Sequence, residues 1–382
     1  MTTYKRLGDY IREVNVRNKD LKVTNLQGVS ISKQFIPSIA NTIGTDMSTY
    51  KVVNPGQFAY GPVTSRNGDK VSIALYKGDD DAIISQAYTV FEVVDKDKMS
   101  SDYLMMWFQR PEFDRYARFH SHGSAREIFD WDELCDTTIP VPSIDRQREI
   151  VEEYETLSRR IRLNEQMIEK LEATAQALYR KMFVDGIDKE NLPDGWRMGT
   201  LGEVAEVITR GKSPKYVDDS PMLVAGQRCV RNHIVDLKIA RTYIPKSTDI
   251  ELKYGDILIN STGEGSLGRV GQVFVNVNGV SFDSHVTLVR FSDEADSFYY
   301  GAKLTMSETD IESLAVGSTG QTELPRDSVI NYNVIIPKSE LIKDFHKDIK
   351  PIKNYATILV QENFKLTELQ SLLLAKMGNL KQ

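Results

Sequence analysis

The sequence predicts an α+β protein in which two strand-rich domains alternate with two long coiled-coil helices, as two copies of one unit. Three features predict this fold: phrases that recur at a near-constant offset, β-branched runs early in each copy, and a heptad pattern that closes each copy. We assign residues 1–142 to the first strand-rich domain, 143–184 to the first helix, 185–337 to the second strand-rich domain and 338–382 to the second helix.

The recurring phrases extend over the whole chain. Residues 7–9 (LGD) return as residues 201–203 (LGE), and the Gly-Ser pair at 123–124 returns at 317–318, both at an offset of 194 residues. The phrase IPVP that ends at residue 142 is echoed by VIIP ending at residue 337, at an offset of 195. A near-constant offset predicts an internal repeat with pseudo-twofold symmetry, typical of a protein that binds something at two places.

Strands are predicted where β-branched and aromatic residues cluster between Gly, Asn and Asp. The clearest such runs are DKVSIALY, AYTVFEVV, GDILINST, VGQVFVNV and HVTLVRF. They place strand-rich structure before each of the two helical segments.

The two helical segments carry matched heptad seams. Apolar residues alternate at spacings of three and four from Ile150 to Met182, and again from Phe345 to Met377. A lone amphipathic helix packed on its own domain is one interpretation, but two matched seams favour mutual pairing. In the second seam, Pro351 either kinks the helix or marks its start.

Polar seam positions predict the direction of pairing. Asn164 is fifth of ten in its seam and Asn363 is sixth of ten. Antiparallel overlap places both amides in one layer, where they can hydrogen-bond and fix the register, whereas parallel pairing buries each against an apolar residue. At 1.5 Å per residue each seam is about 50 Å long, so we expect a dumbbell with the two domains at opposite ends.

Composition excludes several classes of protein. Hydrophobic content of 41% and charged content of 27% are ordinary for a globular protein. No apolar run approaches the ~20 residues of a membrane helix, and the N-terminus has no signal-peptide core, so we expect a cytoplasmic protein with no membrane partner. Cys135 and Cys229 are far apart and are expected to be free thiols. The net charge of −6 means that any DNA contact must come from local basic clusters.

Known catalytic motifs are incomplete in this sequence. Residues 211–213 (GKS) resemble the end of a phosphate loop, but Glu206 stands where its first Gly is required. Residues 263–268 match GxGxxG, yet a strand pattern follows instead of a helix, which favours a β turn. His120 and His122 lack further metal ligands at the usual spacing. We therefore expect neither an enzyme nor a metal site, although an unrecognised active site remains an alternative.

Several longer phrases resemble a known family. They are NPGQFAYGPV, IISQAYTVFEV and GSAREIF in the first domain, IPVPSIDRQREIVEEYETL at the first helix, and LPDGWRMGTLGEVAEVITRGKSPKY and KYGDILINSTGEGSLGRVG in the second domain. Together, and in this order, they resemble the specificity subunit of type I restriction–modification systems over essentially the full length.

The resemblance implies a function. Each strand-rich domain would be a target-recognition domain that reads one half of a bipartite site in double-stranded DNA, and the helices would set the spacing and dock modification subunits, of which we expect two. Those subunits would carry S-adenosylmethionine and methylate adenine, so no cofactor is expected on this chain. A separate restriction/translocase subunit would cleave DNA, and the sequence leaves its presence open. The alternative is a coiled-coil scaffold with two protein-binding heads and no DNA.

Base readout and phosphate contact use polar and basic side chains on loops. In the first domain the candidates are Asn15, Arg17, Asn18, Lys19, Ser32, Lys33, Tyr60, Ser65, Arg66, His120, His122, Ser124 and Arg126. In the second domain they are Arg210, Lys212, Ser213, Lys215, Tyr216, Gln227, Arg228, Arg231, Asn232, Ser261, Thr262, Ser266, Arg269, Ser318, Thr319 and Gln321.

Overall fold

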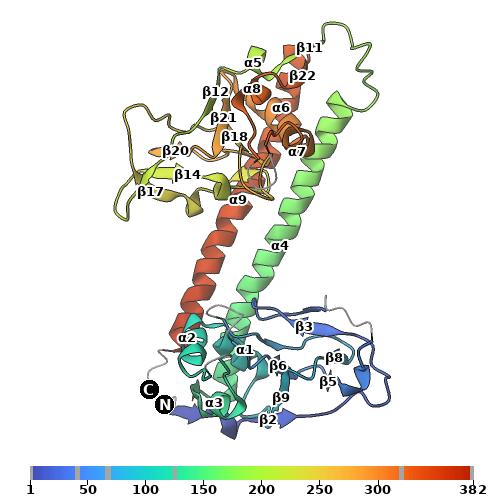
Figure 1. The fold of residues 1–382 in the computed structure, drawn as a ribbon, viewed down its shortest axis with the longest axis vertical. Helices are drawn as coiled ribbons and strands as arrows, with labels where there is room; N and C mark the ends of the chain where they lie inside the picture. Colours follow the sequence, from blue (N-terminus) through green and yellow to red (C-terminus); the bar gives the residue numbers. More distant parts are fainter. Residues whose placement is uncertain (1–2, 39–43, 65–69, 124–126, 318–321, 379–382) are drawn as a thin grey trace. The chain divides into compact units, whose positions relative to one another are not determined.

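The structure, a computed structural model, describes residues 3–38, 44–64, 70–123, 127–317 and 322–378 (Figure 1). The chain forms two compact units: the first comprises residues 1–162 and 363–382, and the second residues 163–362. Each unit therefore combines a strand-rich domain with part of each long helix. None of the helices in these described ranges has the length and apolar character that a bilayer crossing requires.

The first unit mixes short strands with three helices that precede the long one. Its elements are β1 (Thr3–Arg6), the 3-10 helix η1 (Leu7–Asp9), β2 (Ile11–Val14), β3 (Gln27–Val29), β4 (Phe35–Pro37), η2 (Met47–Thr49), β5 (Lys51–Val53), β6 (Phe58–Tyr60), β7 (Ile73–Leu75), β8 (Ala82–Ile84), β9 (Thr89–Val93), α1 (Ser101–Gln109), α2 (Pro111–Phe119), α3 (Trp131–Asp136), β10 (Thr138–Val141) and the start of α4 (Ile144–Phe183).

The second unit follows the same plan with additional strands. Its elements are β11 (Arg197–Thr200), α5 (Leu201–Val204), β12 (Val207–Arg210), β13 (Lys215–Tyr216), β14 (Leu223–Ala225), η3 (Gln227–Cys229), β15 (Val230–Arg231), β16 (Ile234–Val235), η4 (Leu237–Ile239), β17 (Arg241–Ile244), β18 (Ile257–Asn260), β19 (Val270–Gln272), β20 (Val280–Phe282), β21 (Val286–Arg290), α6 (Glu294–Thr305), α7 (Glu308–Glu312), α8 (Arg326–Ile330), β22 (Asn333–Ile336) and most of α9 (Ser339–Met377). The five sequence runs expected to be strands lie at β7, β9, β18, β19 and β21, which confirms them.

The central sheets show the internal repeat. In the first unit the strand order is β2-β9-β6-β7, and in the second it is β12-β21-β18-β19, extended by β16 and β15. The four shared strands are antiparallel neighbours in both units. The predicted α+β fold with an internal repeat is therefore confirmed at the level of topology.

A two-stranded clasp closes each domain at its beginning and end. β1 pairs with β10 in the first unit, and β11 pairs with β22 in the second. The hydroxyl of Tyr103 on α1 donates to the carbonyl of Pro140 over 3.0 Å, and that of Tyr299 on α6 donates to Ile335 over the same distance. An equivalent hydrogen bond thus anchors the paired strands of each unit to the helix packed beside them.

Helix starts follow local sequence rules. The side chain of Ser100 caps α1 by accepting from the Tyr103 amide, and Asp293 caps α6 by accepting from the Ala295 amide. α2 begins with Pro111, whose missing N–H costs nothing in the first turn. These caps fix the helices that cover each sheet.

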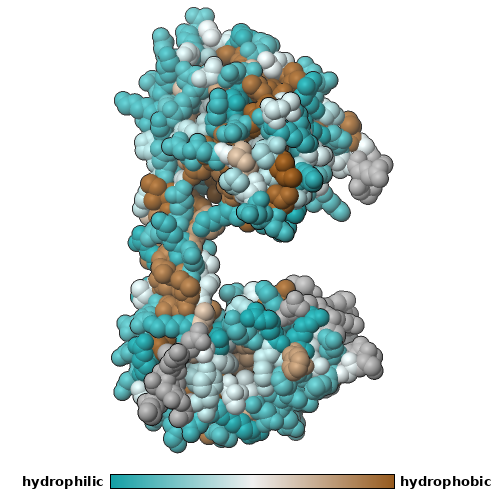
Figure 2. Space-filling model, turned by 90° about the vertical axis from the view of Figure 1, so that its left-hand side faces the viewer, coloured by the Kyte–Doolittle hydropathy of each residue, from teal (hydrophilic) through white to brown (hydrophobic). Residues whose placement is uncertain are grey.

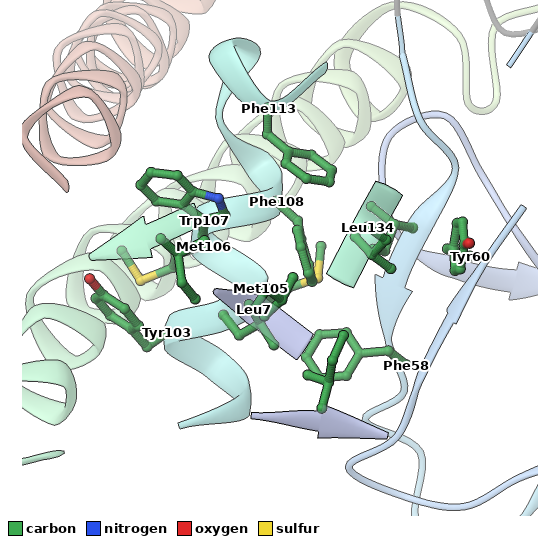
Figure 3. Close-up of a cluster of buried hydrophobic side chains, with 14 of the residues drawn as sticks. Leu7, Phe58, Tyr60, Tyr103, Met105, Met106, Trp107, Phe108, Phe113 and Leu134 are labelled. Carbon is green, nitrogen blue, oxygen red and sulfur yellow. The ribbon is translucent and has the colours of Figure 1, made fainter. Parts of the chain in front are cut away.

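Each unit has its own core, which includes one end of each long helix. In the first unit, aromatic residues of β6, α1 and α2 form the core (Figure 3). Ile150 of α4 and Met377 of α9 belong to the same cluster. In the second unit, residues of β18, β21 and α6 pack with Tyr179 of α4 and with Phe345 of α9. Burial of apolar side chains thus stabilises both the strand-rich domain and the helix ends packed against it.

The two long helices run antiparallel within each unit. In the second unit the Asn164 amide donates to Glu362, and further along α4 the Glu172 carboxylate accepts from Lys353. In the first unit Gln370 donates to Ser158, while Ile150 and Met377 share one core. Antiparallel pairing is therefore confirmed in each unit. Pro351 lies inside α9, which begins at Ser339, so the proline does not mark the start of the helix.

The buried amide of Asn164 has a hydrogen-bond partner on α9 at the residue next to the predicted one. Asn164 is buried, and its amide lies 3.0 Å from the carboxylate of Glu362, the residue before Asn363. A carboxylate is a stronger acceptor for a buried amide than a second amide would be. A pairing between Asn164 and Asn363 themselves stays a prediction.

Candidate nucleic-acid interface

In the second unit, four loops come together, and three of them include candidate residues. The Asn260 amide donates to the backbone carbonyl of Gln227 over 3.1 Å. The Thr262 hydroxyl lies 2.8 Å from Nδ1 of His285, and the Ser213 and Ser284 hydroxyls are 3.2 Å apart. These contacts join the loops after β12, β14, β18 and β20 into one polar surface, which we call the second-unit loop surface.

A buried carboxyl group organises this surface. Asp283 is 4% exposed, and its carboxylate accepts from the His285 amide over 2.9 Å. Desolvation raises the pKa of Asp283. A side chain at Gly211 or Gly226 would overlap Asp283, so the close approach of these loops requires glycine at both positions.

The GxGxxG segment is a turn between antiparallel strands. Gly263, Gly265 and Gly268 have φ angles of 103°, 67° and 82°, and they join β18 to its antiparallel neighbour β19. The interpretation as a β turn is therefore confirmed. Beside the turn, Ser266 donates to the Gly263 carbonyl over 3.3 Å, and the exposed Arg269 donates to that of Gly265 over 2.6 Å.

A short hairpin presents three further candidates. β15 and β16 are joined by Asn232 and His233, whose φ angles of 51° and 61° are those of a type I′ turn. Arg231 and Asn232 are exposed beside this turn, and Arg228 is exposed just before β15. The sequence reasoning did not include His233, although consecutive Asn and His are residues that tolerate positive φ.

An exposed basic strip lies on β13, β17 and the segments beside them. Lys212 donates to the Thr248 carbonyl over 2.9 Å and Lys246 to that of Ser213 over 3.0 Å, while the Arg241 guanidinium lies 3.6 Å from the Tyr216 ring centre. Lys215 is exposed on β13. In the described ranges, none of these four basic side chains has an acidic group within 4.0 Å, so the strip can neutralise phosphates. Sequence reasoning missed Arg241 and Lys246, because only pairing of β13 with β17 brings them to the strip.

Arg210 has a structural role. Its guanidinium forms an ion pair with Glu323 and donates to the Leu324 carbonyl over 2.6 Å. The Leu324 amide in turn donates to Ser261. Arg210 therefore ties β12 to the segment that precedes α8.

In the first unit, the candidates lie in three places. Arg17 pairs with Lys51 of β5 and donates to the Thr49 carbonyl, with Asn15 and Lys19 exposed beside it. Thr64 and Ser121 hydroxyls are 3.0 Å apart, which joins the loop after β6 to the one after α2. Ser32 is exposed on the β3–β4 hairpin, where its hydroxyl contacts Ser30 at 2.7 Å.

His120 and His122 share one carboxylate. The carboxylate of Glu133 lies 3.2 Å from Nδ1 of His120 and 3.3 Å from Nε2 of His122. No group of three or more His, Cys, Asp or Glu with metal-binding geometry occurs among the described residues. The pair is held at the surface by Glu133, which the sequence analysis did not single out.

Four candidates lie in the interior and are withdrawn as contact residues. Tyr60 is fully buried in the first core (Figure 3). Asn18 is 1% exposed and binds both backbone groups of Val23. Lys33 pairs with Asp114 at 2.8 Å and donates to the Phe108 carbonyl, and Ser261 lies 2.6 Å from Thr287. The polar groups of Asn18, Lys33 and Ser261 are thus satisfied inside the protein, and burial keeps all four side chains away from DNA.

Seven candidates lie outside the described residues. They are Ser65, Arg66, Ser124, Arg126, Ser318, Thr319 and Gln321. The residues before two of these loops are equivalent, because Gly123 and Gly317 both have φ of 128°. A backbone bridge closes each loop, between His122 and Ile128 in one unit and between Val316 and Glu323 in the other.

Comparison with known proteins agrees with this duplicated architecture. The family model for the type I restriction modification DNA specificity domain matches residues 33–173 and again 193–365. The MjaIX type I restriction enzyme specificity subunit of Methanocaldococcus jannaschii is 21% identical over 285 residues, which cover 68% of this chain and 64% of that protein. The chain thus spans just under two thirds of the length of this curated relative.

A solved structure has a similar fold. The S subunit of a type I restriction-modification system from M. genitalium superposes with a TM-score of 0.61 at 15% identity, covering 99% of this chain and 96% of the other. Together with the twofold match of the family model, one match for each copy, these findings identify the family. The chain belongs to the type I restriction modification DNA specificity domain family.

Proposed function

We propose that this chain is the DNA-recognition subunit of a type I restriction–modification complex, with each unit reading one half of a bipartite target. The observation that carries the proposal is the pair of family matches on two copies of one fold whose loops differ. The second unit exposes a basic strip and a type I′ hairpin, whereas the first exposes a pair of histidines held by Glu133. Unlike loops on equivalent scaffolds suit unlike half-sites.

Within this proposal the second-unit loop surface provides base contacts and the basic strip provides phosphate contacts. Thr262, His285, Arg231 and Asn232 offer the hydroxyl, imidazole, guanidinium and amide groups that read base edges. Lys212, Lys215, Arg241 and Lys246 offer basic side chains for phosphate contact. In the first unit, Asn15, Lys19, Ser32, His120 and His122 take the corresponding roles.

The helix pair would dock the modification subunits. On the first unit, a groove of about 700 Å³ is lined by Leu157, Leu369, Leu372 and Leu373 and bordered by Glu149, Glu152 and Glu153. Figure 2 shows apolar surface exposed along the long helices, and Leu372 is 59% exposed. An apolar groove with an acidic border suits an amphipathic helix with basic flanks.

Methyl transfer would belong to the docked partners, which carry S-adenosylmethionine, and this chain would supply recognition only. The sequence has no Asn/Asp-Pro-Pro-aromatic motif of the kind used for amino-methyl transfer to adenine. We expect two modification subunits for each chain, one for each half-site.

An electrophoretic mobility shift tests the proposal. The complex of this chain with its modification subunits should bind a genomic fragment containing its target in excess competitor DNA, and omission of this chain should abolish that selectivity. Binding to the modification subunits without any sequence preference would contradict DNA recognition and favour a protein scaffold.

A further inference from the structure

One aromatic side chain of the first unit is conspicuously exposed. Phe119, the last residue of α2, is 82% exposed, more than any other large hydrophobic residue in the described part of the chain. Exposing this much apolar area is unfavourable in water, which points to a surface that is covered when the protein works.

The exposed ring is held by other aromatic groups. Its ring centre lies 5.2 Å from that of His120, which lies 4.2 Å from that of Tyr116. Nδ1 of His120 lies 3.2 Å from Glu133 on α3. Phe119 is therefore backed by a fixed platform, and little ordering is needed when it binds.

The surroundings of Phe119 are basic. Lys70, Arg115 and Arg118 line a depression of about 660 Å³ together with Phe119. Arg115 also lies 3.1 Å from Glu112 at the surface. The acidic residue in the depression, Asp114, turns its carboxylate inward to the buried Lys33 at 2.8 Å. Three basic side chains therefore line the depression beside an exposed aromatic ring.

The described residues of the second unit show no equivalent feature. The matched glycines Gly123 and Gly317 share φ of 128° at an offset of 194 residues. The same offset places Glu312 opposite Arg118 and Ser313 opposite Phe119. Both the ring and the positive charge are thus specific to the first unit.

We propose that Phe119 inserts between two base pairs of the half-site read by the first unit, with Lys70, Arg115 and Arg118 on the flanking phosphates; this rests on the proposed function. Apolar wedges that partly unstack a base step, and aromatic rings that stack on bases, are established modes of nucleic-acid contact. A different occupant of this surface would be an acidic protein segment. Its charge would complement the basic residues, but it would not offer the 82%-exposed ring of Phe119 the flat apolar face that a base provides.

The test uses the complete complex and a duplex containing its target, with 2-aminopurine placed in turn at each position of both half-sites. Local unstacking raises the fluorescence of this probe. We expect a rise at one step in one half-site only. Phe119→Ala should remove the rise and weaken binding roughly 5- to 100-fold, whereas Phe119→Trp should keep both.

The matched control is Ser313→Ala, at the equivalent exposed position of the second unit, which should leave fluorescence and affinity unchanged. Specific binding without any fluorescence rise, or a rise that survives Phe119→Ala, would refute the insertion and leave the proposed function intact. A wild-type complex without sequence-specific binding would refute the proposed function and the insertion with it. Because Phe119 is exposed, an unchanged melting temperature is expected for both of its variants.

Discussion

Lys353 and Glu172 form a nearly buried ion pair between the two long helices of the second unit. The Nζ of Lys353 lies 2.8 Å and 2.7 Å from the two carboxylate oxygens of Glu172, and the two side chains are 9% and 19% exposed. Nζ also lies 5.6 Å from the ring centre of Phe274. Both charged groups lie beside the apolar seam. The cost of removing each charge from water is therefore offset mainly by its attraction to the other.

Removing one member of this pair should therefore be costly. We expect Lys353→Met to lower the free energy of unfolding by about 3 kcal/mol, because a carboxylate is left without its partner. The double variant Glu172→Gln with Lys353→Met should recover most of that loss. Urea unfolding of the four proteins gives the coupling energy, and Lys350→Met, at a more exposed ion pair, is the control. If the losses of unfolding free energy in the two single variants simply add in the double variant, the two charges have no favourable interaction with each other.

Tyr103 and Tyr299 should contribute similar amounts to the stability of their respective units. Tyr103→Phe and Tyr299→Phe each remove a 3.0 Å hydrogen bond to a carbonyl in the closing strand, so each should destabilise its own unit by about 1–2 kcal/mol. Hydrogen exchange of the β10 and β22 amides should accelerate only in the unit that carries the substitution. The exposed Tyr355→Phe serves as the control. Equal acceleration in both units would contradict independent clasps.

Cys229 should be almost unreactive in the folded protein. Burial raises its pKa to about 11, compared with 9.0 for an ordinary thiol. The reactive thiolate is therefore about a hundredfold scarcer at pH 8. In a Cys135→Ala variant, alkylation by iodoacetamide should be correspondingly slow, rise about tenfold for each pH unit up to about pH 11, and become fast in guanidinium chloride. Rapid alkylation of the native variant at pH 8 would show that the thiol is accessible and not desolvated.

The basic strip should determine part of the salt dependence of DNA binding. Substituting both Lys212 and Lys215 by Ala should make the slope of log K against log salt shallower by about 2, since each phosphate contact contributes about 0.9. Lys98→Ala, an exposed lysine paired with Asp95, should leave the slope unchanged. Arg210→Ala is not a test of phosphate contact, because Arg210 forms an ion pair with Glu323 and its loss would disturb the fold. An unchanged slope in the double variant would show that the basic strip does not contact phosphates.

The sequence predicts the repeated parts of the fold well, because they depend on local patterns. The two matched heptad seams predict a pair of helices, and the places of Asn164 and Asn363 in them predict the antiparallel direction. The seams do not decide whether Pro351 lies inside the second helix or at its start. The Lys353–Glu172 pair could not be predicted, since 181 residues separate its members.

The candidate site was harder to predict, because residue type alone does not determine burial. Asn18, Lys33 and Ser261 have the chemistry of DNA contacts, yet each satisfies a buried backbone or side-chain group. Conversely, Arg241 reaches the basic strip only through the pairing of β13 with β17. Phe119 was not among the candidates, and only the structure shows that this last residue of α2 is exposed.

Mapping methylated adenines tests the central proposal most directly. The genome of a host that expresses this chain with its modification subunits should carry one bipartite motif, with two unlike halves at a fixed separation. The triple variant Arg228→Ala, Arg231→Ala, Asn232→Ala on the second-unit hairpin should relax one half of that motif and leave the other half and the spacing unchanged. A single continuous motif, or a variant that alters both halves together, would contradict a protein in which two units each read one half-site.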